Sequence, residues 1–117
     1  MALTERHIDG VTILDLSGHL TEASGAEMWR RVRGLAAAGD TCVLLNLADV
    51  SYVDSSGLGT MLASFVAMRR VGGTLKLLGP TKRTQQLLTI TALATVVPSF
   101  DDEALAVASF GDPRFQI

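Results

Sequence analysis

A short run of polar and small residues near the middle of the chain is where the sequence could support chemistry. The run is Asp54-Ser55-Ser56-Gly57-Leu58-Gly59, and it lies between an apolar segment and a segment with helical spacing. A serine hydroxyl at the start of a helix is exposed, and a phosphate attached there faces free backbone amides and the positive end of the helix dipole. Ser55 is therefore placed to accept a phosphate without unfolding of the domain.

The same run also has a purely structural interpretation. Asp54 or Ser55 caps a helix by accepting a hydrogen bond from the free N–H groups of its first turn, and a cap needs no further role. Gly57 and Gly59 require a reason, since each glycine costs a helix about 1 kcal/mol relative to alanine while it allows another backbone to approach closely. The residue types alone leave both interpretations open.

Other catalytic and binding patterns are incomplete. His7 and His19, expected on a strand and a turn, have no metal-ligand spacing to each other or to Cys42. Gly57-Leu58-Gly59 begins like a dinucleotide-binding loop, but Leu62 stands where the third glycine belongs. The sequence has neither a G-x-x-x-x-G-K-[ST] phosphate loop nor a G-x-S-x-G nucleophile elbow. It therefore predicts no enzyme, no cofactor and no metal site.

Composition limits the partners and the compartment. A chain of 117 residues with 48% apolar content is enough for one packed domain. The net charge of -2 is too weak to attract nucleic acid or anionic lipid, and no apolar run approaches the roughly 20 residues of a membrane-spanning helix. No export signal is evident, and Cys42 is the only cysteine, which we expect as a buried thiol in a reducing, cytoplasmic compartment.

The N-terminal half alternates between strand and helix patterns. Apolar and β-branched residues on either side of Asp9-Gly10 predict a hairpin, and an apolar run too short for a helix predicts a strand covered on both faces. Thr21 and Ser24 are rival N-terminal caps of a helix that lies between the hairpin and the buried strand, and Gly39 is placed to end that helix. In order, we expect a hairpin over residues 3–8 and 11–16, a helix over about 21–38, the central strand over 42–45 and a loop over 49–54.

The C-terminal half continues the alternation, which implies a sheet with helices packed on it. The second helix is expected to bury Leu58, Met61, Leu62, Phe65 and Met68 and to end at Gly72-Gly73. After it we expect a strand over residues 74–78, a helix with Leu87, Leu88 and Leu93, an edge strand at Val96-Val97, and a last helix from Asp101-Asp102-Glu103 toward Phe110.

Another face of the second helix carries only small side chains. Ser56, Thr60, Ala63 and Ala67 recur at helical spacing, apart from the expected core residues. A solvent-facing helix normally carries Lys, Glu, Gln or Arg at such positions. We expect a protein partner to lie against this stripe, which begins beside Ser55; the alternative is that a neighbouring helix of the same domain covers it.

The chain resembles the STAS domain family, named for sulfate transporters and anti-sigma factor antagonists. The resemblance rests on residues 43–59, VLLNLADVSYVDSSGLG, with Gly18-His19-Leu20 before this segment and Gly72-Gly73-Thr74-Leu75 after it, and it covers nearly the whole chain. It implies a stand-alone antagonist with a STAS-like fold. We accordingly expect one α/β domain over residues 1–117, with a mixed sheet of about five strands, about four helices and a loose tail at 111–117.

The resemblance also implies a phosphorylation switch. Ser55 would be phosphorylated by a serine kinase that doubles as an anti-sigma factor, the unphosphorylated domain would bind that kinase and free a sigma factor, and a phosphatase would reset it. The expected partner-binding residues are Thr21, Asp54, Ser56, Gly57, Thr60 and Ala63.

Two positions depart from the family pattern. Thr21 stands where antagonists often carry aspartate after the Gly-x-Leu turn, and Ala92 stands where glycine is common late in the third-helix region. Members of the same family also serve lipid-transport complexes and the cytoplasmic ends of anion transporters. The alternative function is therefore that of a soluble STAS subunit of a lipid-transport complex, which would need no phosphate on Ser55.

Overall fold

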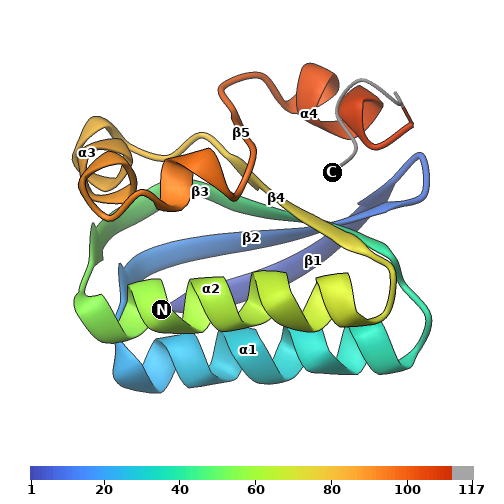
Figure 1. The fold of residues 1–117 in the computed structure, drawn as a ribbon, viewed down its shortest axis with the longest axis horizontal. Helices are drawn as coiled ribbons and strands as arrows, with labels where there is room; N and C mark the ends of the chain where they lie inside the picture. The colour runs from blue at the N-terminus through green and yellow to red at the C-terminus, as the bar shows by residue number, and fades with distance from the viewer. Residues whose placement is uncertain (112–117) are drawn as a thin grey trace.

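The protein folds around one mixed β-sheet, seen here in a computed structural model that describes residues 1–111. The strand order is β1-β2-β3-β4-β5, in which β1 and β2 are antiparallel and the other neighbours are parallel (Figure 1). The strands are β1 Ala2–Ile8, β2 Val11–Leu20, β3 Cys42–Val53, β4 Thr74–Leu78 and β5 Ser99–Phe100. The predicted hairpin and central strand are confirmed.

Helices cover both faces of the sheet. The long helices α1 and α2 lie side by side on one face, and the shorter helices lie toward the other (Figure 1). Their bounds are α1 Glu22–Ala37, α2 Ser55–Arg70, α3 Lys82–Ile90, the 3₁₀ helix η1 Leu93–Thr95 and α4 Glu103–Ser109. In the described part of the chain, no helix is both long and apolar enough to cross a bilayer. Apart from Gly111, the tail expected at 111–117 lies outside the described residues.

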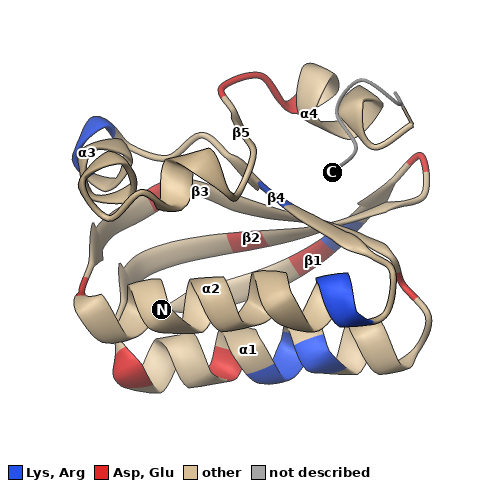
Figure 2. Ribbon diagram, in the orientation of Figure 1, with Lys and Arg blue, Asp and Glu red and all other residues tan. Residues whose placement is uncertain are grey.

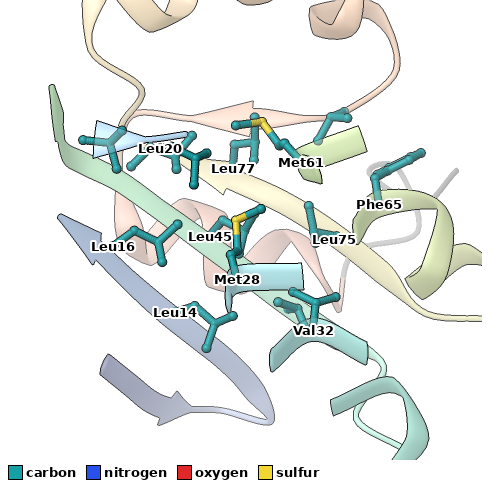
Figure 3. Packing of buried hydrophobic residues seen from close by; sticks show 14 of the residues in the cluster. Leu14, Leu16, Leu20, Met28, Val32, Leu45, Met61, Phe65, Leu75 and Leu77 are labelled. Atoms are coloured by element: carbon teal, nitrogen blue, oxygen red, sulfur yellow. The ribbon is translucent and has the colours of Figure 1, made fainter. Parts of the chain in front are cut away.

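The main core lies between the sheet and the pair α1 and α2. Met28 and Val32 from α1 and Met61 and Phe65 from α2 point toward the leucines of the inner strands (Figure 3). A second cluster between the sheet and α4 contains Val11, Ile13, Leu44, Leu78, Ala106 and Val107. Val43, Leu44 and Leu45 of β3 are buried and belong to the clusters on the two faces of the sheet, which explains the continuous apolar start of the strand.

The β3 strand is longer than the sequence indicated. The loop expected over residues 49–54 is wrong, because β3 continues to Val53 and pairs with β2 as far as Leu20. The pairing has two register irregularities, opposite Asp15–Ser17 and Gly18–His19 of β2, and at each of them β3 has one extra residue. His19 itself lies in the strand rather than in a turn. Because bulges break the in–out alternation of side chains, the far half of β3 lacks the periodic signal of a strand.

The segment after α3 also differs from expectation. The α3 helix ends at Ile90, Leu93 lies in η1, and the edge strand is Ser99–Phe100 rather than Val96-Val97. The amides of Val96 and Val97 both donate to the Leu93 carbonyl, at 3.0 and 2.9 Å, so both valines belong to a turn. The Val97 side chain is buried in the core, although strand propensity would place both valines in the sheet.

Ala92, where the family often has glycine, has a positive φ of 62°. This left-handed conformation is favourable for glycine and costs other residues about 1 kcal/mol. Glycine is the better fit to the turn that starts η1. Cys42, expected to be buried, is half-buried.

A tight junction at the ends of β2 and β3 fixes where α2 begins. The Leu20 carbonyl accepts a hydrogen bond from the Asp54 amide at 3.2 Å. A side-chain carbon on Gly57 would lie 2.2 Å from the same carbonyl oxygen. The backbone that approaches Gly57 is therefore the chain's own β2, and only glycine fits there.

A second close contact holds α1 against α2. A side-chain carbon on Gly25 of α1 would lie 2.4 Å from Oγ1 of Thr60 on α2. The Thr60 hydroxyl donates to the Gly57 carbonyl at 2.9 Å, which keeps it in place. The two helices thus pack closely near their N-terminal ends because one partner is glycine.

An ion network ties α4 to the sheet. The Arg6 guanidinium on β1 donates to Oδ1 of Asp15 on β2 at 2.9 Å and to Oε1 of Glu103 on α4 at 2.6 Å. Asn46 on β3 donates to the same Asp15 carboxylate at 2.8 Å. The hydrogen bond from Arg6, with a further one from Asn46, lowers the pKa of Asp15 from its ordinary value despite partial burial. The Asp15 carboxylate is thus stabilised in its charged form.

Paired glycine substitutions in α2 test the junction. Gly57→Ala should lower the free energy of unfolding by about 1–3 kcal/mol, because the new methyl group meets the rigid Leu20 backbone. Gly59→Ala is the matched control, since no atom lies within 4 Å of the added carbon, and it should raise stability by up to about 1 kcal/mol through helix propensity. Urea unfolding followed by circular dichroism measures both. Equal effects of the two substitutions would mean that the junction does not require glycine.

Acid unfolding tests the Arg6 network. Because the folded pKa of Asp15 is lowered, its contribution to stability is complete above the unfolded pKa of about 3.9 and is lost as the pH falls through the folded value. Arg6→Gln should cost about 1 kcal/mol at pH 7, as expected for a partly exposed pair. Its difference from the wild type should shrink as the pH falls below about 4 and the Asp15 carboxylate becomes protonated.

The control for this experiment is Arg83→Gln, since Arg83 is exposed on α3 and outside the network. Its unfolding free energy should follow the wild type at every pH. A deficit of Arg6→Gln that stays constant down to about pH 2 would show that the arginine acts by packing and not by charge.

Candidate functional site

Ser55 is the first residue of α2 and is exposed at the carboxyl edge of the sheet. Asp54 directly before it is the N-cap, and its Oδ1 accepts a hydrogen bond from the Gly57 amide at 2.7 Å. Of the two rival caps considered from the sequence, Asp54 therefore fills the structural role. The Ser55 side chain is left available for another function.

The start of α2 combines backbone amides that can donate to an anion with one negative charge, the Asp54 carboxylate, that would repel it. In the first turn of a helix, the amides of the first residues have no acceptor within the helix. Those of Ser55 and Ser56 precede the Gly57 amide that Asp54 caps. A phosphate on Ser55 would meet these amides and the helix dipole, while the Asp54 carboxylate would repel it. These effects oppose each other, so the folded domain can carry the modification with little net change in stability.

Thr21 lies at the same edge as Ser55. Leu20 and Val53 are paired across β2 and β3, so the residues that follow them, Thr21 and Asp54, start neighbouring helices. Thr21 is the N-cap of α1, and its amide donates to Oγ of Ser24 at 2.8 Å. Both rival caps of α1 thus take part in one capping arrangement. An aspartate at position 21 would add a charge beside the Ser55 end of α2, and threonine does not.

An aromatic pair near this edge was not singled out from the sequence. His19 and Tyr52 face each other across β2 and β3 with ring centroids 5.6 Å apart in an edge-on arrangement. Both residues are exposed, Tyr52 with 42% of its surface accessible. Tyr52 lies two residues before the helix cap, and a large exposed aromatic residue there is a signal that sequence reading could have used.

The small-residue stripe of α2 is not one continuous open surface. Ser56 is exposed, Gly57 is buried, and Thr60 is half-buried against Gly25 of α1. For Thr60, the alternative that a neighbouring helix covers the stripe is confirmed.

Ala63 and Ala67 are half-buried and line a groove between α1 and α2. Leu62, expected in the core, is 39% exposed and lines the same groove. The structure therefore brings Thr21, Asp54, Ser55 and Ser56 together and leaves Ala63 about two helical turns away along α2.

The described residues offer little for other chemistry. Within residues 1–111, no group of three or more His, Cys, Asp or Glu side chains could hold a metal ion. A nucleophilic serine needs a base within hydrogen-bonding reach. The charged group adjoining Ser55 in the chain, Asp54, is engaged in capping α2.

Comparison with known proteins agrees with this arrangement. The model of the family described as STAS domain matches residues 2–106. The chain is 29% identical over 103 residues to the anti-sigma F factor antagonist of Paenibacillus polymyxa, covering 86% of this chain and 87% of the relative. It is 31% identical over 84 residues to the anti-sigma-B factor antagonist of Bacillus subtilis, covering 72% and 76%.

A solved structure shares the fold. The anti-sigma factor antagonist SpoIIAA in its unphosphorylated form superposes with a TM-score of 0.72 at 18% identity, covering 92% of this chain and 94% of that chain. The phosphorylated form of SpoIIAA from Bacillus gives a TM-score of 0.71 at 20% identity, with coverages of 89% and 96%. With its five-stranded mixed sheet, its capped second helix and a family match over nearly its whole length, the chain belongs to the STAS domain family.

Proposed function

We propose that this protein is an anti-sigma factor antagonist, a protein-binding switch controlled by phosphorylation of Ser55. The observation that carries the proposal is an exposed serine at the first position of a helix whose cap is supplied by the preceding aspartate. Two relatives that span most of this chain are named anti-sigma factor antagonists. A structural neighbour occurs in phosphorylated and unphosphorylated forms.

The proposed partners are an anti-sigma factor serine kinase and a phosphatase. The unphosphorylated domain binds the kinase and releases a sigma factor, and the phosphatase restores this form. Binding of this kind takes place in the cytoplasm and requires no catalytic residue, cofactor, nucleic acid or membrane insertion on the side of the antagonist.

The proposed kinase surface is centred on the edge that contains Ser55. Thr21, Asp54 and Ser56 surround the phosphoacceptor, and Ala63 marks the far limit of the surface along α2. Gly57 and Thr60 contribute indirectly, since they pack against Leu20 and Gly25 and set the position of the helix start.

The switch acts at the interface and not through the fold. A phosphate adds about -1.5 to -2 charges. Buried against a partner without a matching cation, such a group costs several kcal/mol, and each 1.4 kcal/mol is about tenfold in affinity. Loss of partner binding without loss of folding is the expected consequence.

Phosphate mapping and partner capture test this proposal. Incubation with the cognate kinase and ATP should add one phosphate to Ser55, located by peptide fragmentation, and Ser55→Ala should abolish it. Ser56→Ala, at the adjacent exposed serine, is the matched control and should remain a substrate. The phosphorylated protein should lose at least about tenfold in kinase affinity while its melting temperature changes by a few degrees at most.

Two results would contradict the proposal. Phosphate on Ser56, or full modification of Ser55→Ala, would show that the acceptor is wrong. Capture from the native cell of lipid-transport subunits, with equal yield from wild-type and Ser55→Asp baits, would favour the alternative function of a soluble STAS subunit in such a complex.

A further inference from the structure

A groove of about 790 Å³ runs between α1 and α2 on the side turned away from the sheet. Its floor is formed by small residues, among them Ala36 of α1 and Gly59, Ala63 and Ala67 of α2. Three larger apolar residues rise beside it and stay exposed: Leu62 at 39%, Val66 at 38% and Val71 at 48%. Exposed apolar residues gathered along one groove are typical of an interaction surface.

The groove has a basic rim. Arg33 of α1 and Arg70 of α2 line it, and Arg69 lies beside it in the last turn of α2. The basic residues of α2 lie at its C-terminal end and those of α1 follow its acidic residues, which lie toward the start of α1 (Figure 2). The sequence of α2 contains no acidic residue to neutralise this rim. Although the whole chain is weakly acidic, this groove is locally basic.

Trp29, the only tryptophan of the chain, lines the groove from α1. The Arg33 guanidinium lies over its ring, 4.7 Å from the centroid. The indole Nε1 is buried, and no acceptor for it lies among residues 1–111. Trp29 therefore supplies an aromatic wall to the groove, with a guanidinium of the basic rim stacked on it.

The shape and charge of the groove select the occupant. From Gly59 to Val71 it follows about 18 Å of helix, which is the length of about three helical turns. A second copy whose helices run parallel to α1 and α2 would bring the arginines of both rims together, which is repulsive. A lipid bilayer is flat and would reach the rim without filling the hollow, whereas the apolar face of a helix fits between two parallel helices.

We propose that this groove binds an acidic amphipathic helix of another protein. Leucine-like side chains of that helix pack on Leu62, Val66 and the alanine floor, and its carboxylates pair with Arg33 and Arg70. The proposal goes beyond the Ser55 switch. The groove begins at Gly59, about 6 Å along the helix from Ser55, and shares Ala63 with the proposed kinase surface. Its basic residue on α2, Arg70, lies about 22 Å along the helix from Ser55, more than the Debye length of about 8 Å in physiological salt. Phosphorylation of Ser55 therefore leaves binding in the groove nearly unchanged.

Fluorescence of Trp29 provides the test in the full-length protein. The probe is a synthetic helical peptide of about four turns, with leucines on one face, glutamates flanking them, and no tryptophan or tyrosine. It should shift the Trp29 emission to shorter wavelength in a saturable manner. The same peptide with lysine in place of glutamate should bind at least about tenfold more weakly, and added salt should weaken the glutamate peptide.

Protein variants locate the binding. Arg70→Glu and Val66→Gln, both at exposed positions, should each weaken the glutamate peptide by about fivefold or more. Arg30→Glu is the matched control, since Arg30 lies on the same helix as Arg33 but lines a different hollow with Glu27 and Leu35. It should stay within about twofold of the wild type, as should Ser55→Asp.

Three outcomes would overturn the proposal. The first is a loss of charge specificity. It would appear as equal affinity for the lysine and glutamate peptides, or as equal effects of Arg70→Glu and Arg30→Glu on the affinity for the glutamate peptide. Another is an emission shift caused by phosphatidylglycerol vesicles while the glutamate peptide has no effect, which would assign the surface to membranes. The third is self-association in sedimentation experiments that Val66→Gln abolishes and the peptide does not compete with. Failure of kinase binding to respond to Ser55 would leave these results unaffected.

Discussion

The architecture depends on the contact between the Leu20 carbonyl and the first turn of α2. That carbonyl accepts the Asp54 amide and leaves no room for a side chain at position 57. It therefore joins the end of one strand to the start of a helix that follows the neighbouring strand. Since α1 begins directly after Leu20, one carbonyl group fixes the N-terminal ends of both long helices. The contact positions Asp54 and Gly57, and Ser55 between them is exposed at the start of α2.

The same constraint produces the groove. Once the helix starts are fixed, Gly25 on α1 and Thr60 on α2 hold the helices together near that end. Further along, alanine and glycine line the space between the helices, so the surface stays hollow. Arg69 and Arg70 lie in the last turn of α2, where positive charge is favourable toward the helix dipole, but that effect explains neither Arg33 of α1 nor the exposed Leu62 and Val66. The close packing of α1 and α2 at their N-terminal ends therefore produces both the Ser55 edge at that end and the groove further along the two helices.

Much of this fold could be read from the sequence because local signals agreed with tertiary structure. The Asp9-Gly10 turn, the apolar start of β3 and the capping residues of α1 and α2 each have a local cause. The errors arose where pairing between distant segments decides which residues form a strand. Extra residues in β3 break its usual alternation of side chains, and β5 forms at Ser99 because that residue pairs with Leu77. The exposure of Leu62 was hidden for the same reason, since an apolar residue in a helix reads as core whether or not a partner covers it.

In the proposed function, the different roles of Asp54 and Ser55 allow a small domain to act as a switch without a change of fold. If the serine were the cap, its phosphorylation would replace a hydrogen bond that holds the helix, and the signal would destabilise the fold that presents it. Because Asp54 already caps the Gly57 amide, the proposed phosphorylation of Ser55 would leave that hydrogen bond in place. A change of charge confined to one edge alters partner affinity there and decays within a short distance in salt. Such a domain needs no second conformation, and a surface two or three helical turns away can act independently of the switch.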